Sequence, residues 1–202
     1  MSKSADIFLG DSQFDWSKCL CITNRHLCPG TLEDQLERHV LPLRPRAVIL
    51  REKDLTPAEY SDLLRRVAAL CRAADVPLIP HTFVDAALQQ GFTAIHLPMP
   101  ALLQLSPSDR QRFTVVGASV HSVDEARAAV AAGATYVTAS HIFPTDCKKG
   151  LPPRGLPFLR SVCTAVPLPV FALGGVDPAN AAACLASGAS GVCMMSEFMT
   201  LS

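Results

Sequence analysis

Short apolar runs and longer amphipathic segments alternate along almost the whole chain. The apolar runs that we expect to form strands cover residues 19–23, 47–50, 77–79, 94–97, 114–119, 136–139, 169–173 and 191–196. Most of them are apolar at every position instead of at every second position. This pattern is typical of parallel strands that helices cover on the outside.

The segments between these runs carry apolar residues at helical spacing. They predict helices over 31–40, from Pro57 to about 71, and over 83–90, 123–132, 156–165 and 180–187. Thr31 is the expected N-cap of the first helix, and Pro57 suits the first position of the second. Gly91, Gly133 and Gly188 each end a predicted helix shortly before a strand. The same helix–glycine–strand unit therefore repeats along the chain.

Eight strands alternating with helices predict a small (β/α)8 TIM barrel over residues 19–202. A doubly wound sheet is the alternative, but it would need a glycine-rich turn after the first strand, and residues 19–26 contain none. The chain continues for only six residues after Ser196, so we expect the last helix to be truncated or absent. Residues 1–18 form an N-terminal extension, in which Phe8, Phe14 and Trp16 are expected to cover the resulting apolar gap, either within one chain or across a homodimer.

Charge and composition exclude several classes of protein. Lys plus Arg and Asp plus Glu both number 18, so no broad field favours binding to nucleic acid or to an anionic membrane. No apolar run approaches the roughly 18 residues of a membrane span, and the first residues lack the apolar core of a signal peptide. We therefore expect a cytoplasmic location. The eight cysteines contain no Cys-x-x-Cys pair and are expected to act as small apolar residues, with Cys147 as an exposed exception.

In a barrel, the carboxyl ends of all strands face one mouth, and polar residues follow most of the predicted strands. Convergence from positions far apart in sequence predicts a ligand pocket there. The residues at these positions are Arg51, Glu52, Lys53, His81, Ser119, His121, His141, Thr145, Lys148, Gly174, Gly175 and Ser196.

Two of these segments suggest a small anionic ligand. After the strand at 136–139, the loop up to 156 is rich in Pro, Gly and Lys, with Lys148 among its cations and His141 as a proton carrier near neutral pH. After the next strand, Gly174 and Gly175 would let a phosphate approach backbone N–H groups at a helix N-terminus. Met195 and Ser196 would form the other wall of this phosphate site. The alternative is that the two glycines serve a tight turn only.

A family resemblance begins in the loop after the strand at 136–139, with the sequence Ser140-His141-Ile-Phe-Pro-Thr-Asp-Cys147-Lys148-Lys-Gly. This loop resembles that of the thiamin phosphate synthase/TenI superfamily. Synthases carry Gly-Pro in place of Ser140-His141 and usually Thr in place of Cys147. The histidine form is similar to the TenI branch, whose characterised members are thiazole tautomerases.

Other positions match the superfamily or depart from it. Arg51 and Lys53 resemble the cations of its Gln-x-Arg-x-Lys strand, although a solvated charge cluster is the alternative. Positions that match the family include Ser119, His121, Gly174, Gly175 and Ser196. Synthases hold Mg²⁺-pyrophosphate with Asn-Asp after the third strand and Asp after the fourth. Here His81-Thr82 and Pro100 or Ala101 stand at those positions, so we expect no metal and no cofactor.

The resemblance therefore implies a thiazole tautomerase-like isomerase of thiamin biosynthesis, which would aromatise a small phosphorylated carboxythiazole. His141 would be the catalytic proton carrier. The remaining substrate-binding candidates are Arg51, Lys53, His81, Ser119, His121, Thr145, Cys147 and Lys148. Two alternatives stay open: a thiamin phosphate synthase, which is a transferase, and a non-catalytic regulator that only binds thiazole phosphates. His96 lies within an apolar strand and is expected to be a hydrogen-bonded core residue.

Overall fold

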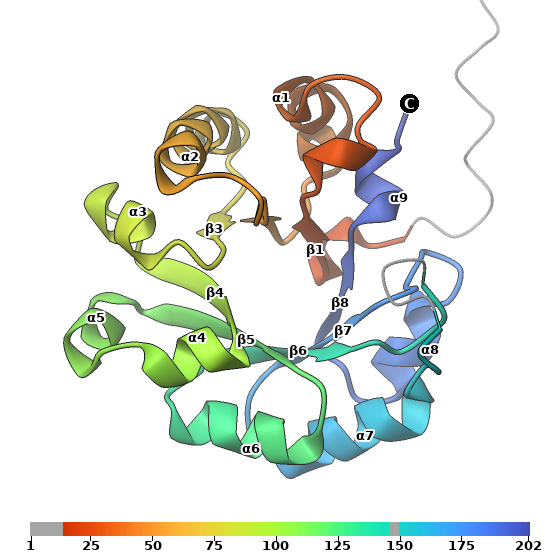
Figure 1. Cartoon of the computed structure of the whole chain (residues 1–202). Coiled ribbons are helices and arrows are strands. Elements are labelled where there is room, and N and C mark those ends of the chain that lie inside the picture. Colours follow the sequence, from red (N-terminus) through yellow and green to blue (C-terminus); the bar gives the residue numbers. More distant parts are fainter. Residues whose placement is uncertain (1–13, 146–149) are drawn as a thin grey trace, which may run out of the picture.

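Eight parallel strands form the centre of the molecule and helices surround them, as Figure 1 shows. The computed structural model describes residues 14–145 and 150–202. The strands are β1 (Cys19–Ile22), β2 (Ala47–Leu50), β3 (Leu78–Pro80), β4 (Ala94–Pro98), β5 (Val115–Val120), β6 (Tyr136–Ser140), β7 (Val170–Leu173) and β8 (Gly191–Met194). Their order is β3-β2-β1-β8-β7-β6-β5-β4, and a single bridge between His81 and His96 brings the two edges together. The predicted (β/α)8 barrel is confirmed.

The helices lie on the outside of the strands. They are α1 (Leu32–Gln35), α2 (Pro57–Ala73), α3 (Val84–Gln89), α4 (Met99–Gln104), α5 (Pro107–Arg112), α6 (Val123–Ala131), α7 (Gly155–Ala165), α8 (Ala181–Ala186) and α9 (Ser196–Met199). Short 3-10 segments are η1 (Trp16–Lys18), η2 (Arg25–Leu27) and η4 (Leu41–Leu43), and α1 continues as a π-helical turn, η3 (Leu36–Val40). The expected caps are present: Thr31 accepts from Asp34 N, and Pro57 starts α2.

Two helices between β4 and β5 were not predicted from the sequence. Three prolines at 98, 100 and 107 suggest a loop there, because proline breaks helix interiors. In the structure each falls in the first turn of a helix or just before it, where its missing N–H costs nothing. Ser106 additionally caps α5 by accepting a hydrogen bond from Asp109 N. This Ser-Pro-x-Asp sequence was the available signal for α5.

The last helix of the barrel is short, as expected from the sequence. The helix after β8 is α9, which spans four residues. Trp16 packs on Phe198 of α9, with ring centroids 5.1 Å apart, and Phe14 packs edge-on against Trp16 at 5.0 Å. Phe14 and Trp16 therefore pack over α9 within one chain. Phe8 lies outside the described residues, and the homodimer stays a prediction.

The barrel interior is filled by side chains that alternate inward along the strands. Its apolar cluster consists of Leu20, Ile22, Ala47, Ile49, Ile79, Tyr136, Phe171 and Cys193. Gly117 on β5 leaves room within this interior: a Cβ at that position would overlap the Tyr136 ring and Nδ1 of His96. The absence of a side chain at Gly117 therefore allows Tyr136 and His96 to meet.

Cysteines are mostly core residues in this fold. Five of the described cysteines are buried (Cys19, Cys21, Cys71, Cys184 and Cys193), and Cys147 lies outside the described residues. Burial raises the pKa of the Cys71 thiol to about 12 and that of Cys184 to about 11, so both stay protonated near neutral pH. Within residues 14–145 and 150–202, no helix has both the length and the hydrophobicity to cross a membrane.

Candidate active site

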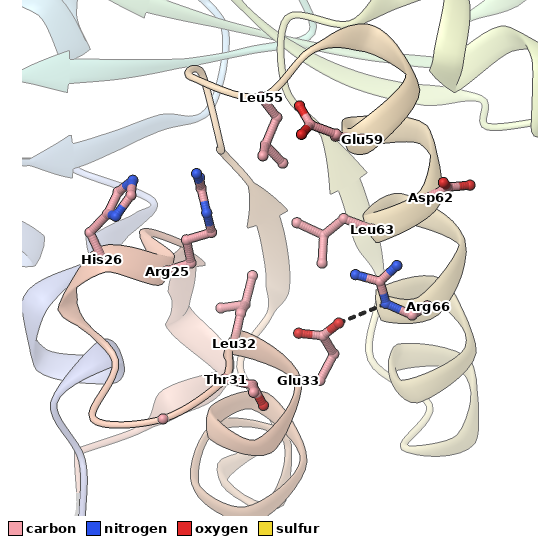
Figure 2. A pocket seen from close by; sticks show the side chains of 11 residues that line it. Arg25, His26, Thr31, Leu32, Glu33, Leu55, Glu59, Asp62, Leu63 and Arg66 are labelled. Atoms are coloured by element: carbon pink, nitrogen blue, oxygen red, sulfur yellow. Dashed lines mark hydrogen bonds and ion pairs between the residues drawn. The ribbon is translucent and has the colours of Figure 1, made fainter.

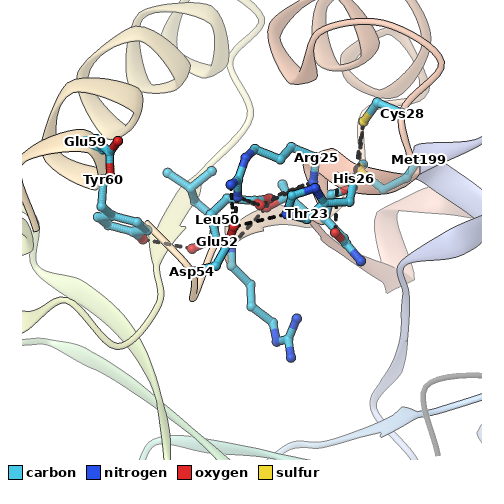
Figure 3. Close-up of polar contacts among 12 residues, drawn as sticks. Thr23, Arg25, His26, Cys28, Leu50, Glu52, Asp54, Glu59, Tyr60 and Met199 are labelled. Carbon is cyan, nitrogen blue, oxygen red and sulfur yellow. Dashed lines mark hydrogen bonds and ion pairs between the residues drawn. The ribbon is translucent and has the colours of Figure 1, made fainter. Parts of the chain in front are cut away.

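A buried carboxylate ties together the ends of β1 and β2 at the barrel mouth (Figure 3). Glu52 is 2% exposed and accepts hydrogen bonds from Thr23 Oγ1 at 2.7 Å and from the Arg25 guanidinium at 3.0 Å. Arg25 also binds Asp54 at 2.7 Å, and this contact holds the pKa of Asp54 well below its usual range. Thr23 Oγ1 accepts from the Arg51 backbone N–H at 2.9 Å. Glu52 is therefore a structural anchor, a role that its sequence position did not reveal.

Two stacked histidines close the barrel between β3 and β4. The rings of His81 and His96 lie 5.5 Å apart between centroids, and the two residues are 4% and 3% exposed. Nε2 of His96 lies 2.8 Å from Ser119 Oγ, and its Nδ1 lies 2.9 Å from the Tyr136 hydroxyl. Thr138 Oγ1 donates to Ser119 Oγ at 3.3 Å. His96 is a satisfied core residue, as predicted, and it also links β4, β5 and β6 just below the mouth.

Both histidines are neutral near pH 7. Burial is the main cause, since a charged imidazolium loses its hydration in the barrel interior. His96, Lys53 and Arg51 lower the pKa of His81 further, to about 2. Arg51 and Lys53 likewise add to the effect of burial on His96, whose pKa is about 3. The two cations of the β2 end therefore act electrostatically on the histidine pair.

A tyrosine positions His81. The Tyr60 hydroxyl donates to the Leu50 carbonyl at 2.8 Å and accepts from the His81 backbone N–H at 2.9 Å. Thr82, the next residue, has a left-handed backbone with φ of +69°, and its hydroxyl lies 2.6 Å from Nδ1 of His81. The ends of β2 and β3 are thus joined through one buried phenol.

His121 and His141 line a cavity of about 330 Å³ at the barrel mouth. Its lining consists of His121, His141, Leu151, Pro152, Pro153 and Arg154. His141 is 5% exposed and its Nε2 lies 3.3 Å from the Leu151 carbonyl oxygen, while Nδ1 of His121 lies 3.3 Å from the Glu125 carboxylate. Thr145 is half-buried in the loop that follows. Cys147 and Lys148 lie outside the described residues.

Gly174 and Gly175 follow β7 with positive φ values of +96° and +65°. A Cβ at Gly174 would overlap the side chain of His141, and one at Gly175 would overlap the Pro144 carbonyl oxygen. The two glycines are therefore required by the packing of two mouth loops. Met195 is half-buried and Ser196 exposed at the start of α9. Phosphate binding by this group stays a prediction.

The donor atoms at the mouth do not fit Mg²⁺, which takes oxygen ligands and usually at least one carboxylate. His81 and Thr82 follow β3, and Pro98 to Ala101 follow β4 into α4. Within residues 14–145 and 150–202, no group of three His, Cys, Asp or Glu side chains is placed to hold a metal ion. No catalytic step is therefore assigned to a metal.

A larger hollow lies outside the mouth, between α1 and α2, with a volume of about 520 Å³ (Figure 2). Both of its arginines already have acidic partners: Arg66 binds Glu33 across the groove at 2.7 Å, and Arg25 binds Asp54 and Glu52. This groove therefore offers an anion fewer available positive charges than the barrel mouth does.

Comparisons with known proteins agree on one family. A family model described as thiamine monophosphate synthase matches residues 19–198. The thiamine-phosphate synthase of Moorella thermoacetica is 34% identical over 187 residues, which are 90% of this chain and 87% of that protein. The one from Lacticaseibacillus paracasei is 36% identical over 157 residues, or 75% and 72% of the two chains. The solved thiamine phosphate pyrophosphorylase of Pyrococcus furiosus has a TM-score of 0.73 at 27% identity and covers 94% of this chain and 91% of its own.

These similarities overturn the interpretation of the chain as a thiazole tautomerase, because the relatives are named synthases, which are transferases. The isomerase interpretation depended on His141 and on the missing carboxylates. In the structure His141 is buried against Gly174, and its Nε2 lies 3.3 Å from the Leu151 carbonyl oxygen. By similarity over nearly its whole length, the chain belongs to the thiamine monophosphate synthase family.

Proposed function

We propose that this protein is a transferase of the thiamine-phosphate synthase type, which joins a pyrimidine diphosphate and a thiazole phosphate and releases pyrophosphate. The main support is the similarity to proteins named thiamine-phosphate synthase over up to 90% of the chain. The mouth supplies suitable chemistry, because Arg51 and Lys53 stand together at the end of β2.

The proposed reaction needs no oxidant and no net proton transfer. The bond between the pyrimidine methylene carbon and the diphosphate oxygen breaks, and its electron pair leaves with pyrophosphate. The thiazole ring nitrogen supplies the electron pair for the new carbon–nitrogen bond. In this proposal Arg51 and Lys53 stabilise the charge that develops on the leaving group, which is the usual role of such cations in group transfer.

The thiazole phosphate is assigned to the opposite side of the mouth. Gly174 and Gly175 bring backbone close to the loop after β6, and Met195 and Ser196 stand at the end of β8. The proposal places the two reactants across the mouth from each other, with Ser119 between them on β5. His121 and His141, in the cavity beside the glycines, would contact the thiazole.

The direct test is product formation from the two precursors, measured by mass spectrometry as thiamin phosphate. The reaction is run both with Mg²⁺ and with EDTA, so that the result does not depend on the metal. Arg51→Ala should lower the rate by roughly a hundredfold. Arg72→Ala, which removes an exposed cation near the other end of α2, should leave it unchanged. Absence of product above the enzyme-free background under both conditions would refute the proposed function.

A further inference from the structure

The residues at the barrel mouth do not provide the ligands of a magnesium site, and this affects how the substrate can bind. Carboxylates of the described mouth already have partners: Glu52 is enclosed by Thr23 and Arg25, and Glu125 accepts from the His121 backbone N–H at 2.6 Å. At the β3 end the polar side chains are the His81 imidazole and the Thr82 hydroxyl, and the β4 end continues as Pro98 to Ala101, which carry no polar side chain. A divalent cation would find few suitable ligands among them.

Positive charge is nevertheless present at the same place. Arg51 and Lys53 carry two formal charges, as many as one Mg²⁺ ion would bring. In the sheet Leu50 is paired with Pro80, so Arg51 lies beside His81 where β2 and β3 end. Burial and these two cations keep both imidazoles neutral, so the imidazoles add no charge of their own. Next to these cations, His81 and Thr82 offer neutral polar atoms at the end of β3. The neighbouring carboxylates Glu52 and Asp54 are both paired with Arg25, so a net positive charge stays at this point and favours an anion over a free metal cation.

We propose that the mouth binds the diphosphate group of its substrate directly, through Arg51 and Lys53 with His81 and Thr82 as neutral partners, and without a divalent cation. This inference rests on the proposed function and names how the same site holds its leaving group. Free Mg²⁺ forms a complex with pyrophosphate and lowers its charge. Magnesium should therefore leave binding unchanged or weaken it.

Inorganic pyrophosphate is the probe, and calorimetry on the full chain measures its affinity in EDTA and in excess Mg²⁺. We expect binding in EDTA that Mg²⁺ does not strengthen. Arg51→Ala and Lys53→Ala should each weaken it roughly tenfold or more, since each removes a charge-assisted contact. Arg72→Ala should bind like the parent. Binding that needs Mg²⁺, or that Mg²⁺ strengthens tenfold, would overturn the proposal.

A second variant restores a carboxylate at the end of β3. Thr82→Asp suits the local backbone, because a β-branched residue is strained at a φ of +69° and aspartate tolerates this conformation better. In this variant Mg²⁺ should strengthen pyrophosphate binding. The control is Thr114→Asp, which adds the same charge at the exposed residue just before β5, at the opposite end of the barrel. If Thr82→Asp and Thr114→Asp respond to Mg²⁺ alike, the diphosphate does not lie at the β3 end and the proposal is wrong.

These measurements separate the two proposals. Product formation only in Mg²⁺ would support the transferase and refute metal-free binding. Pyrophosphate binding in EDTA without product under any condition would refute the transferase and support the binding mode.

Discussion

The two sides of the barrel mouth differ in the parts of the chain that form them. On the side of β1 to β5, side chains make the contacts: Glu52 joins β1 to β2, Tyr60 joins β2 to β3, and His96 joins β4 to β5 and β6. On the side of β6 to β8, backbone lies against backbone, with Gly174 and Gly175 packed on the loop from His141 to Pro144. The first side can therefore change its chemistry by substitution, whereas the second side is constrained by shape.

The largest expected effect on stability lies on the side of β1 to β5, at the buried carboxylate of Glu52. Glu52→Ala should lower the free energy of unfolding by roughly 3–5 kcal/mol, because it leaves Thr23 and the Arg25 guanidinium without their buried partner. Urea unfolding measures the change. Asp54→Ala removes the exposed partner of the same arginine and should cost much less. Equal losses for the two variants would show that burial does not distinguish these carboxylates.

Acid should destabilise the same side through its two histidines. His81 and His96 are neutral in the folded protein down to a pKa of about 2 and 3, whereas in the unfolded chain they bind protons below about pH 6.5. Stability is therefore lost as the pH falls through 6.5, by about 2 kcal/mol per histidine between about pH 7 and pH 5. His96→Gln cannot titrate and should remove about half of this loss in urea titrations. A flat profile for the parent would contradict the neutral pair.

On the side of β6 to β8, adding a single methyl group at Gly175 should lower the stability strongly. Gly175→Ala places a Cβ against the Pro144 carbonyl at a positive φ, and we expect a loss of roughly 2–4 kcal/mol. This corresponds to a fall in Tm of roughly 5–12 °C for a chain of this size. Gly91→Ala is the matched control, since its φ is +76° with nothing within 4 Å of the new Cβ, and its cost should be about 1 kcal/mol. Similar values for both would show that packing is unimportant here.

The smallest effect concerns the phenol between β2 and β3. Tyr60→Phe keeps the stacking on Phe83 but removes the bonds to the Leu50 carbonyl and the His81 N–H. The loss should be roughly 1–2 kcal/mol. Hydrogen exchange at the His81 amide should become faster, while amides of β7 keep their protection. Uniform loss of protection in all strands would mean that the two sides of the mouth are not independent.

The fold was largely predictable because its signals are local. Burial on both faces makes each strand a continuous apolar run, and all eight observed strands fall within two residues of the predicted ends. The start of α2 at Pro57 followed from its own sequence. The helices α4 and α5 were missed because prolines suit both loops and first helical turns.

The site was less predictable because its contacts join residues far apart in the chain. Thr23, Arg25 and Glu52 meet only when β1 and β2 lie side by side. The hydrogen bond between Tyr136 and His96 joins residues that are 40 positions apart in the sequence. The functional interpretation was wrong for a related reason. It gave most weight to His141 in one loop, whereas similarity along residues 19–198 assigns the family.

Gly117 limits the order in which this barrel can acquire mutations. Any larger residue there collides with the Tyr136 ring and with His96, so in a lineage both of these side chains would have to make room before position 117 could gain one. The reverse order passes through an intermediate with an overfilled interior and a broken Tyr136–His96 bond. The mutational histories of β4, β5 and β6 are therefore linked, even though none of these three residues has to touch a substrate.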